Sequence, residues 1–270
     1  MALLSCEYYS QSRRSQQTFN VILPMESMPD MDGKVAYSAG PFKTLYLLHG
    51  YSGSRNDWLR NSLVETWARE HQYAIVMPDG ANSFYLDNED TGERCGAFIG
   101  EELVRVSREM FPLSLTREDT ALAGLSMGGF GALRNGLYYS NVFSSVIALS
   151  SALITDEVAA MKPGESNAIA PYTYYRHTFG PPEKLLDSVR DPKHLARHCL
   201  MKGSVPQIFL ACGKEDFLYQ KNLDFHSYLK RIGYPHTWWV RSGAHDFNFW
   251  SKALQAAFYW LGEETSSKES

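Results

Sequence analysis

A serine lies between two glycines in the segment Gly124-Leu125-Ser126-Met127-Gly128, which fits the pattern G-x-S-x-G. A serine held on a sharp turn from a strand into a helix can act as a nucleophile, and glycines two positions away on either side avoid the clash that a Cβ would cause there. The apolar run before Ser126 and the small and apolar residues after it predict that strand and that helix. The alternative is a glycine-rich turn with an incidental serine.

A serine nucleophile needs a histidine that takes its proton and a carboxylate that orients the histidine. At a turn of this kind the chain order is serine, then acid, then histidine, each on a loop after a strand. Asp216 follows the β-rich run 206–213, and His245 follows the β-rich run 236–243. We therefore predict Ser126 as the nucleophile, Asp216 as the acid and His245 as the base.

Other titratable residues are weaker candidates for these two roles. Glu215 is the alternative to Asp216 as the acid. In that case Asp216 would cap the following helix. Asp246 is adjacent to His245 and is expected to cap the final helix. His226 and His236 are expected in a helix and at a strand start. Three further aspartates do not follow a strand in the required way: Asp187, Asp191 and Asp224.

Two backbone amides are candidates for holding the negative charge that forms on an attacked carbonyl oxygen. Met127 is the first residue of the predicted helix, where the N–H groups and the helix dipole favour negative charge. The second donor is expected from the loop after the run 44–50, where Gly50 permits close approach of the backbone and Tyr51 N–H is the candidate. His49 precedes the serine in the chain and is interpreted as structural.

Seven β-rich runs alternate with helical patterns along the chain. Because most of the runs are continuously apolar, they predict a parallel sheet that is covered on both faces. The alternation predicts a doubly wound α/β sheet with an antiparallel hairpin at the N-terminus. The runs are residues 16–24, 44–50, 73–80, 120–126, 143–152, 206–213 and 236–243, and the helical patterns are 56–71, 96–111, 127–140, 218–232 and 246–261.

We expect one domain over residues 1–262, followed by a flexible tail at 263–270. Residues 155–205 break the alternation with many prolines, glycines and tyrosines, and are interpreted as a partial, lid-like cap. The alternative is a surface excursion packed on the core. Large aromatic residues are more often part of the core than of a pocket. The candidates for lining the substrate pocket are Trp58, Phe84, Tyr85, Tyr172 and Tyr175.

Composition excludes several classes of partner. The formal net charge is −4 without runs of like charge, so neither nucleic acid nor an anionic membrane surface is expected to bind. No run of 18 apolar residues and no clear signal peptide is present, which favours a cytoplasmic protein, although a trimmed secreted form would read the same.

His194 and His198 have zinc-like spacing without the glutamate of the metalloprotease signature, so no metal site is expected. The four cysteines, which are scattered, are interpreted as buried thiols.

Six segments together resemble the putative-esterase family of α/β hydrolases. They are "LLHGYSG", "PDGANSFY", "FIGEEL", "GLSMGGFGAL", "GKEDFL" and "GAHDFNFW". The family includes esterase D or S-formylglutathione hydrolase-like proteins, tributyrin, acetyl and feruloyl esterases, and mycolyltransferases, and the resemblance runs from Thr44 to Trp260. It implies the α/β-hydrolase fold and the same five roles for Ser126, Asp216, His245, Tyr51 and Met127.

The resemblance and the motifs predict a serine carboxylesterase that needs no cofactor. Soluble short-chain or aromatic-acid esters are expected as substrates, including acetyl, butyryl and feruloyl esters and acetylated carbohydrate. The alternatives are a thioesterase of the S-formylglutathione hydrolase type, an acyltransferase, and a non-catalytic binding protein. The loop "GYSGS" lacks the cysteine that S-formylglutathione hydrolases tend to carry there, which speaks against the thioesterase. The sequence leaves open whether the chain forms a homo-oligomer.

Overall fold

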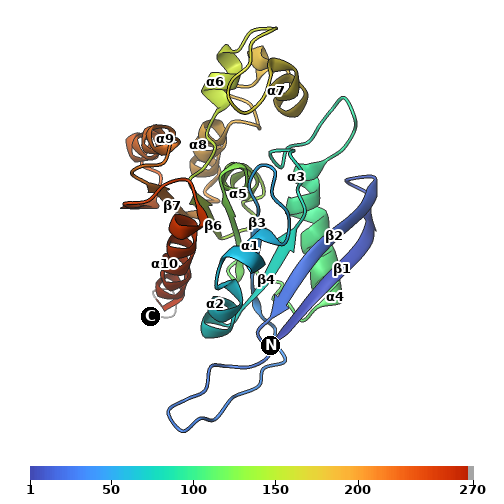
Figure 1. The fold of residues 1–270 in the computed structure, drawn as a ribbon, viewed down its shortest axis with the longest axis vertical. Coiled ribbons are helices and arrows are strands. Elements are labelled where there is room, and N and C mark those ends of the chain that lie inside the picture. The colour runs from blue at the N-terminus through green and yellow to red at the C-terminus, as the bar shows by residue number, and fades with distance from the viewer. Residues whose placement is uncertain (267–270) are drawn as a thin grey trace.

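The computed structural model describes residues 1–266, so the last four residues of the expected tail 263–270 lie outside the described part of the chain. Its strands form one eight-stranded sheet in the order β1-β2-β4-β3-β5-β6-β7-β8 (Figure 1). β1 and β2 are antiparallel to their neighbours and the other strands are parallel. The strands are β1 (Ala2–Ser10), β2 (Ser15–Leu23), β3 (Lys43–Leu48), β4 (Tyr73–Pro78), β5 (Thr120–Leu125), β6 (Ser145–Leu149), β7 (Gln207–Gly213) and β8 (His236–Arg241).

The predicted mostly parallel sheet with an antiparallel N-terminal hairpin is confirmed. The first strand of that hairpin, β1, was not among the predicted runs. Its residues alternate between half-buried and exposed, because β1 is an edge strand with one face toward the core. β4, β5 and β6 are buried at every position, which is why they read as continuous apolar runs.

Helices cover both faces of the sheet (Figure 1). One face carries α1, α2 and α10, and the other carries α4, α5, α8 and α9, which divides the apolar core into two clusters. The helices are α1 (Asp57–Asn61), α2 (Val64–His71), α3 (Cys95–Ala97), the π-helix η1 (Phe98–Glu102), α4 (Leu103–Met110), α5 (Met127–Tyr138), α6 (Thr155–Ala160), α7 (Tyr172–Phe179), the 3-10 helix η2 (Pro182–Lys184), α8 (Pro192–Lys202), α9 (Tyr219–Arg231) and α10 (Phe247–Ser266).

Two of the helical patterns are interrupted in the structure. The pattern 56–71 divides into α1 and α2 because Ser62 is extended and its hydroxyl donates to the Trp58 carbonyl at 2.6 Å. The pattern 96–111 contains the π-helix η1 between α3 and α4. At the C-terminus α10 continues to Ser266, past residue 262, where the domain was expected to end.

The segment 155–205 divides into two parts. α6 and α7 lie together beyond the end of the sheet, at the top of Figure 1, whereas α8 packs against α5 and α9 in a helical layer of the core. The cap is tied to that layer by ion pairs, including Glu157 to Lys221 at 2.7 Å and Asp156 to Lys193 at 2.5 Å. Among the described residues, no helix combines the length and apolar character that crossing a membrane requires.

Candidate active site

Ser126 lies at the turn between β5 and α5. Its φ of 54° and ψ of −116° belong to a region that side-chain-bearing residues rarely adopt. The turn brings backbones into close contact, because a Cβ on Gly124 would overlap the Gly128 carbonyl and a Cβ on Gly128 would lie 2.5 Å from the His49 carbonyl oxygen. The two glycines therefore permit the turn that presents the serine hydroxyl.

His245 lies beside this hydroxyl. Its Nε2 is 3.0 Å from Ser126 Oγ, although the two residues are 119 positions apart in the chain. On the other side of the ring, Nδ1 lies 2.8 Å from Asp216 Oδ2. Because an ionised carboxylate only accepts hydrogen bonds, Nδ1 carries the proton and Nε2 is left to accept the Ser126 hydroxyl hydrogen.

The Asp216 side chain is fully buried on the loop after β7. Burial acts to raise the pKa of Asp216, but hydrogen bonds from His245 and from the Leu218 amide, which donates to Oδ1 at 2.8 Å, prevail and lower it. The carboxylate therefore remains ionised next to the imidazole.

The neighbouring acids have other contacts. Glu215 is exposed and accepts hydrogen bonds from the Ser242 hydroxyl at 3.2 Å and the Gly243 amide at 2.5 Å, which fastens the loop that leads to His245. Asp246 accepts a hydrogen bond from the Phe249 amide at 3.1 Å, as the expected cap of α10 would.

Two aromatic rings hold the imidazole of His245 in place. The Phe217 ring centroid lies 4.6 Å from it, and Trp250 meets it edge-on at 4.8 Å. These contacts restrict rotation of the imidazole away from the line between Ser126 and Asp216.

The two predicted amide donors, those of Tyr51 and Met127, belong to the backbone next to Ser126. Met127 begins α5, and the loop after β3 passes close to the serine, since a Cβ on Gly50 would lie 3.5 Å from Ser126 Cβ. Within the described residues, neither the Met127 amide nor the Tyr51 amide has a hydrogen-bond partner in the chain. Both donors are therefore available to an oxygen bound next to Ser126.

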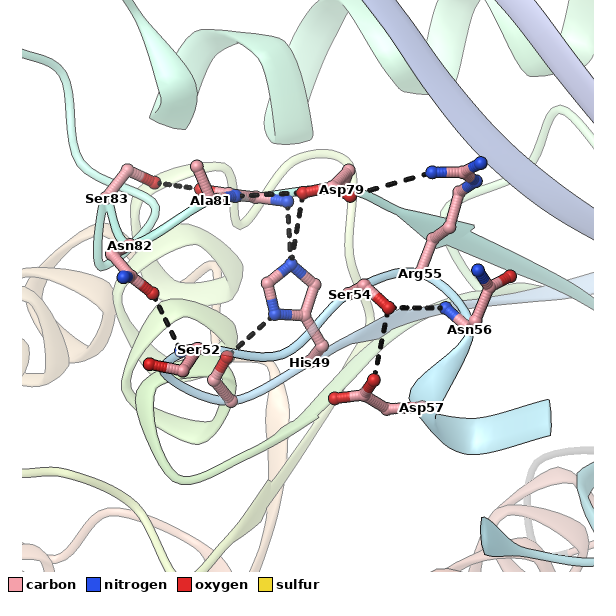
Figure 2. A network of polar contacts seen from close by, with 12 residues as sticks. His49, Ser52, Ser54, Arg55, Asn56, Asp57, Asp79, Ala81, Asn82 and Ser83 are labelled. Atoms are coloured by element: carbon pink, nitrogen blue, oxygen red, sulfur yellow. Dashed lines mark hydrogen bonds and ion pairs between the residues drawn. The ribbon is translucent and has the colours of Figure 1, made fainter. Parts of the chain in front are cut away.

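His49, which Figure 2 shows within its network of polar contacts, fixes the direction of the Tyr51 amide through the Gly50 carbonyl. Its Nδ1–H donates to the Gly50 carbonyl at 2.7 Å, and the Gly53 amide donates to the same oxygen at 3.1 Å. Its Nε2 accepts from the Gly80 amide at 2.8 Å. Because the Gly50–Tyr51 peptide unit is planar, holding its carbonyl also sets where its N–H points.

Further contacts in Figure 2 join the loop after β3 to the loop after β4. Ser52 donates its amide to Asn82 Oδ1 at 2.7 Å, and Arg55 lies 3.7 Å from the Asp79 carboxylate. The loop that carries Tyr51 is thus supported from one side by backbone and side-chain contacts.

A cavity of about 250 Å³ opens beside Ser126. Its walls are mostly apolar, and its polar end consists of the Glu157–Lys221 ion pair and Asn167, which donates to Glu157 at 2.9 Å. The other lining residues are Tyr51, Phe84, Met127, Ala152, Ile154, Ala168, Ile169, Tyr175, Phe217 and Leu218.

Two of the five predicted pocket residues, Phe84 and Tyr175, line this cavity, and the structure places the other three elsewhere. Trp58 is buried under the opposite face of the sheet and donates to the Leu48 carbonyl at 3.1 Å. Tyr85 is fully buried and donates to the His49 carbonyl at 3.0 Å. Tyr172 begins α7, half-exposed, outside the lining.

Sequence reasoning missed most of the cavity residues. Ile154, Asn167 and Ile169 belong to the cap and its connections, and Lys221 lies on α9. Phe217 directly follows the predicted acid Asp216, and this adjacency was the one feature of the sequence that could have identified a missed cavity residue.

Four of the other histidines lie in two pairs. His226 and His236 lie in α9 and at the start of β8, as predicted, with Nδ1 and Nε2 2.7 Å apart. His194 and His198 on α8 stack with centroids 6.2 Å apart. In the part of the chain that the structure describes, no three histidine, cysteine or acidic side chains gather where they could hold a metal ion.

The chain is similar to known proteins along nearly its whole length. A family model described as "Putative esterase" matches residues 10–261. The chain is 40% identical over 264 residues to an acetyl esterase of Caldicellulosiruptor saccharolyticus, which covers 97% of this chain and 99% of that protein.

Two solved structures from Staphylococcus aureus are similar along nearly the whole chain. Fluorophosphonate-binding serine hydrolase F, in a substrate-bound structure, is 31% identical with a TM-score of 0.83, and S-formylglutathione hydrolase is 30% identical with a TM-score of 0.80. Each comparison covers 96% of this chain and 98% of the other. The predicted family and fold are confirmed: this chain belongs to the putative-esterase family of α/β hydrolases and is a serine esterase.

Proposed function

We propose that this enzyme hydrolyses carboxylic esters through an acyl-enzyme on Ser126, with His245 as the base and Asp216 as the acid. The observation that carries the proposal is the continuous hydrogen-bonded series from Ser126 Oγ through the His245 ring to the buried Asp216 carboxylate. A series of this geometry activates serine nucleophiles on several unrelated folds.

The first half of the reaction forms the acyl-enzyme. Ser126 Oγ attacks the ester carbonyl carbon while its proton passes to His245 Nε2, and the carbonyl oxygen becomes an oxyanion that the Tyr51 and Met127 amides hold. The imidazolium is stabilised by ionised Asp216. When the oxyanion collapses, the bond to the alcohol breaks and His245 gives its proton to the leaving oxygen.

The second half of the reaction releases the acid. Water takes the place of the alcohol, loses a proton to His245 and attacks the acyl carbon. Collapse of the second tetrahedral intermediate breaks the bond to Ser126 Oγ, which regains a proton from His245. None of these steps calls on a cofactor.

Short-chain and compact aromatic-acid esters are the substrates that the site supports. The cavity of about 250 Å³ beside Ser126 has mostly apolar walls and suits a small acyl group. Its size speaks against long fatty acyl chains, and the relative from Caldicellulosiruptor saccharolyticus is named an acetyl esterase.

A thioesterase reaction is the second candidate. It is favoured by the similarity to S-formylglutathione hydrolase of Staphylococcus aureus, at 30% identity. The chemistry at Ser126 would be the same, with a thiol instead of an alcohol as the leaving group. Transfer of the acyl group to an alcohol instead of water is the remaining alternative.

A rate panel distinguishes these functions. It compares 4-nitrophenyl acetate, butyrate, octanoate and ferulate with S-formylglutathione, and uses Ser126→Ala as the control. We expect kcat/KM to be highest for acetate, butyrate or ferulate and absent in Ser126→Ala. Undiminished turnover by Ser126→Ala would refute the mechanism, and a maximum at the glutathione thioester would make the second candidate the function. Product analysis with added alcohol measures transfer against hydrolysis.

A further inference from the structure

The cavity beside Ser126 shares a wall with a second cavity. The second cavity has a volume of about 140 Å³ and lies between α6, the start of α8 and α9. Of the described residues, only Glu157 on α6 and Lys221 on α9 line both cavities. Neighbouring positions of the chain face opposite sides of this wall, since Ile154 lines the cavity beside Ser126 and Leu153 lines the second one.

Glu157 and Lys221 form an ion pair in this wall. Lys221 Nζ lies 2.7 Å from Glu157 Oε2, and Asn167 donates to Glu157 Oε1 at 2.9 Å. The Tyr175 hydroxyl holds Asn167 in turn, by donating to its Oδ1 at 3.1 Å. Hydrogen bonds from Lys221 and Asn167 lower the pKa of Glu157 against the effect of burial, so the carboxylate is charged at neutral pH.

A bound acyl chain can reach this pair. The exposed fraction of the side chain is 35% for Lys221 and 39% for Glu157, and both residues line the cavity that opens at Ser126. The pair is therefore part of the surface that a substrate meets.

The two sides of the pair differ in chemistry. The cavity beside Ser126 has mostly apolar walls, whereas the second cavity is lined by Asp156, Asp191, Asp224 and Lys193. Contact with apolar walls favours an alkyl chain, but the same chain among charged groups would remove water from them without replacing its hydrogen bonds. An alkyl group is thus favoured on one side of the ion pair only.

An acyl chain that extends from Ser126 meets the apolar walls first and the ion pair at the polar end. A longer chain would have to separate Lys221 from Glu157 and take water from both charges. We propose that the Glu157–Lys221 ion pair sets the upper limit of acyl-chain length for this esterase, and that small apolar side chains in its place would join the two cavities. This inference rests on the proposed function, because it assumes that the acyl group occupies the cavity beside Ser126.

A neighbouring ion pair provides a matched comparison. Asp156 on α6 lies 2.5 Å from Lys193 on α8, and this contact ties the cap to the same helical layer as the Glu157–Lys221 pair does. Asp156 and Lys193 line the second cavity but not the cavity beside Ser126. Loss of either pair removes one tie of the cap, but only loss of the Glu157–Lys221 pair opens the wall.

Kinetics with 4-nitrophenyl esters tests the limit. In Glu157→Ala/Lys221→Ala, the ratio of kcat/KM for octanoate to kcat/KM for acetate should rise at least tenfold over the wild type, as burial of roughly two further methylene groups would give. In Asp156→Ala/Lys193→Ala the ratio should stay within about twofold of the wild type. An unchanged ratio in the first variant would overturn the proposal. An equal rise in both variants would also overturn it, because a looser cap would then explain the effect.

A second variant decides the matter if the double alanine variant does not fold. Glu157→Gln/Lys221→Met keeps the approximate size of both side chains and removes both charges. Octanoate should then gain several-fold over acetate, since no charge has to lose its water when the longer chain binds. The same ratio as in the wild type would count against the proposal.

Failure of this proposal is distinguishable from failure of the proposed function. A fluorophosphonate reacts with an activated serine, so it should label the wild type and both double alanine variants at Ser126, but not Ser126→Ala. If the wild type is neither labelled nor active on esters, the proposed function fails, and the chain-length limit fails with it. If all three proteins are labelled at Ser126 and the octanoate-to-acetate ratio is unchanged, only the chain-length limit fails.

Discussion

Asp216 Oδ2 and His245 Nδ1 lie 2.8 Å apart, and the carboxylate that makes this contact is completely buried. The contact selects the imidazole tautomer in which Nε2 faces Ser126 without a proton. The position of one hydrogen atom on His245 therefore depends on a carboxylate that does not line the cavity beside Ser126.

Replacing Asp216 with asparagine should lower kcat on 4-nitrophenyl acetate by about 10³- to 10⁴-fold, because an amide in that place permits the wrong tautomer. Circular dichroism should show an unchanged fold. The matched control is Glu215→Gln, since Glu215 is exposed and contacts the Gly243 loop instead of the imidazole. A larger loss of kcat in Glu215→Gln than in Asp216→Asn would show that the assignment of the acid to Asp216 is wrong.

The stability that Asp216 contributes should depend on pH. Its pKa is lowered in the folded protein, so the unfolded chain binds the proton more readily. The contribution is complete above the unfolded value, near pH 4, and is lost as the pH falls through the folded pKa. Calorimetry from pH 3 to 7 should show that, as the pH falls, the Tm of the wild type decreases more than the Tm of Asp216→Asn. A constant difference would mean that Asp216 does not titrate in this way.

Loss of the His49 ring should impair catalysis without touching the reacting atoms. His49→Ala removes the shorter of the two hydrogen bonds that hold the Gly50 carbonyl, so the Tyr51 amide is aimed less firmly at the oxyanion. Complete loss of one such donor typically costs about 10²- to 10³-fold in kcat, and we expect a fall within or just below this range with little change in KM.

The control for His49 is Tyr51→Phe, which keeps both the backbone amide and the aromatic ring. Its kcat should stay within a few-fold of wild type. If KM alone changed in His49→Ala, the residue would serve substrate binding and not orientation of the amide.

A methyl group at position 128 should destabilise the fold. The Cβ of Gly128→Ala would lie 2.5 Å from the His49 carbonyl oxygen and 2.8 Å from that of Leu48, which forces α5 and β3 apart. Overpacking of this kind costs about 1–3 kcal/mol in free energy of unfolding. Urea unfolding compares it with Gly262→Ala on α10, where an added Cβ meets no atom within 4 Å. Equal stability of the two variants would contradict the close approach at Gly128.

Truncating Ile169 should weaken the binding of larger acyl groups. Ile169 lines the cavity from the cap and is 53% exposed, so Ile169→Ala should fold normally. We expect KM for the butyrate and ferulate esters to rise by about three- to tenfold, consistent with about 1 kcal/mol of lost apolar contact, while acetate is little affected. Leu186→Ala, at an exposed position outside the cavity lining, is the control. Parallel changes in both variants would argue against this wall of the pocket.

Local pattern was sufficient to find Ser126, Asp216 and His245 as neighbours. The glycines around Ser126 predict a tight turn, and Asp216 and His245 follow apolar runs that form parallel strands. Because parallel strands end at the same edge of the sheet, residues just beyond those ends come together whatever the rest of the chain does. β1 was not predicted, because an edge strand with one exposed face has no continuous apolar run.

The sequence by itself therefore determined the sheet, the family and the residues whose roles depend on local backbone geometry. Only the tertiary structure decided which aromatic rings line the cavity beside Ser126: Phe84 does so while adjacent Tyr85 is buried in the core, and Trp58 lies beneath the opposite face of the sheet. It also separated α8 from the cap. The physical reason is that side-chain direction and burial depend on packing between segments distant in the chain, which local spacing does not encode.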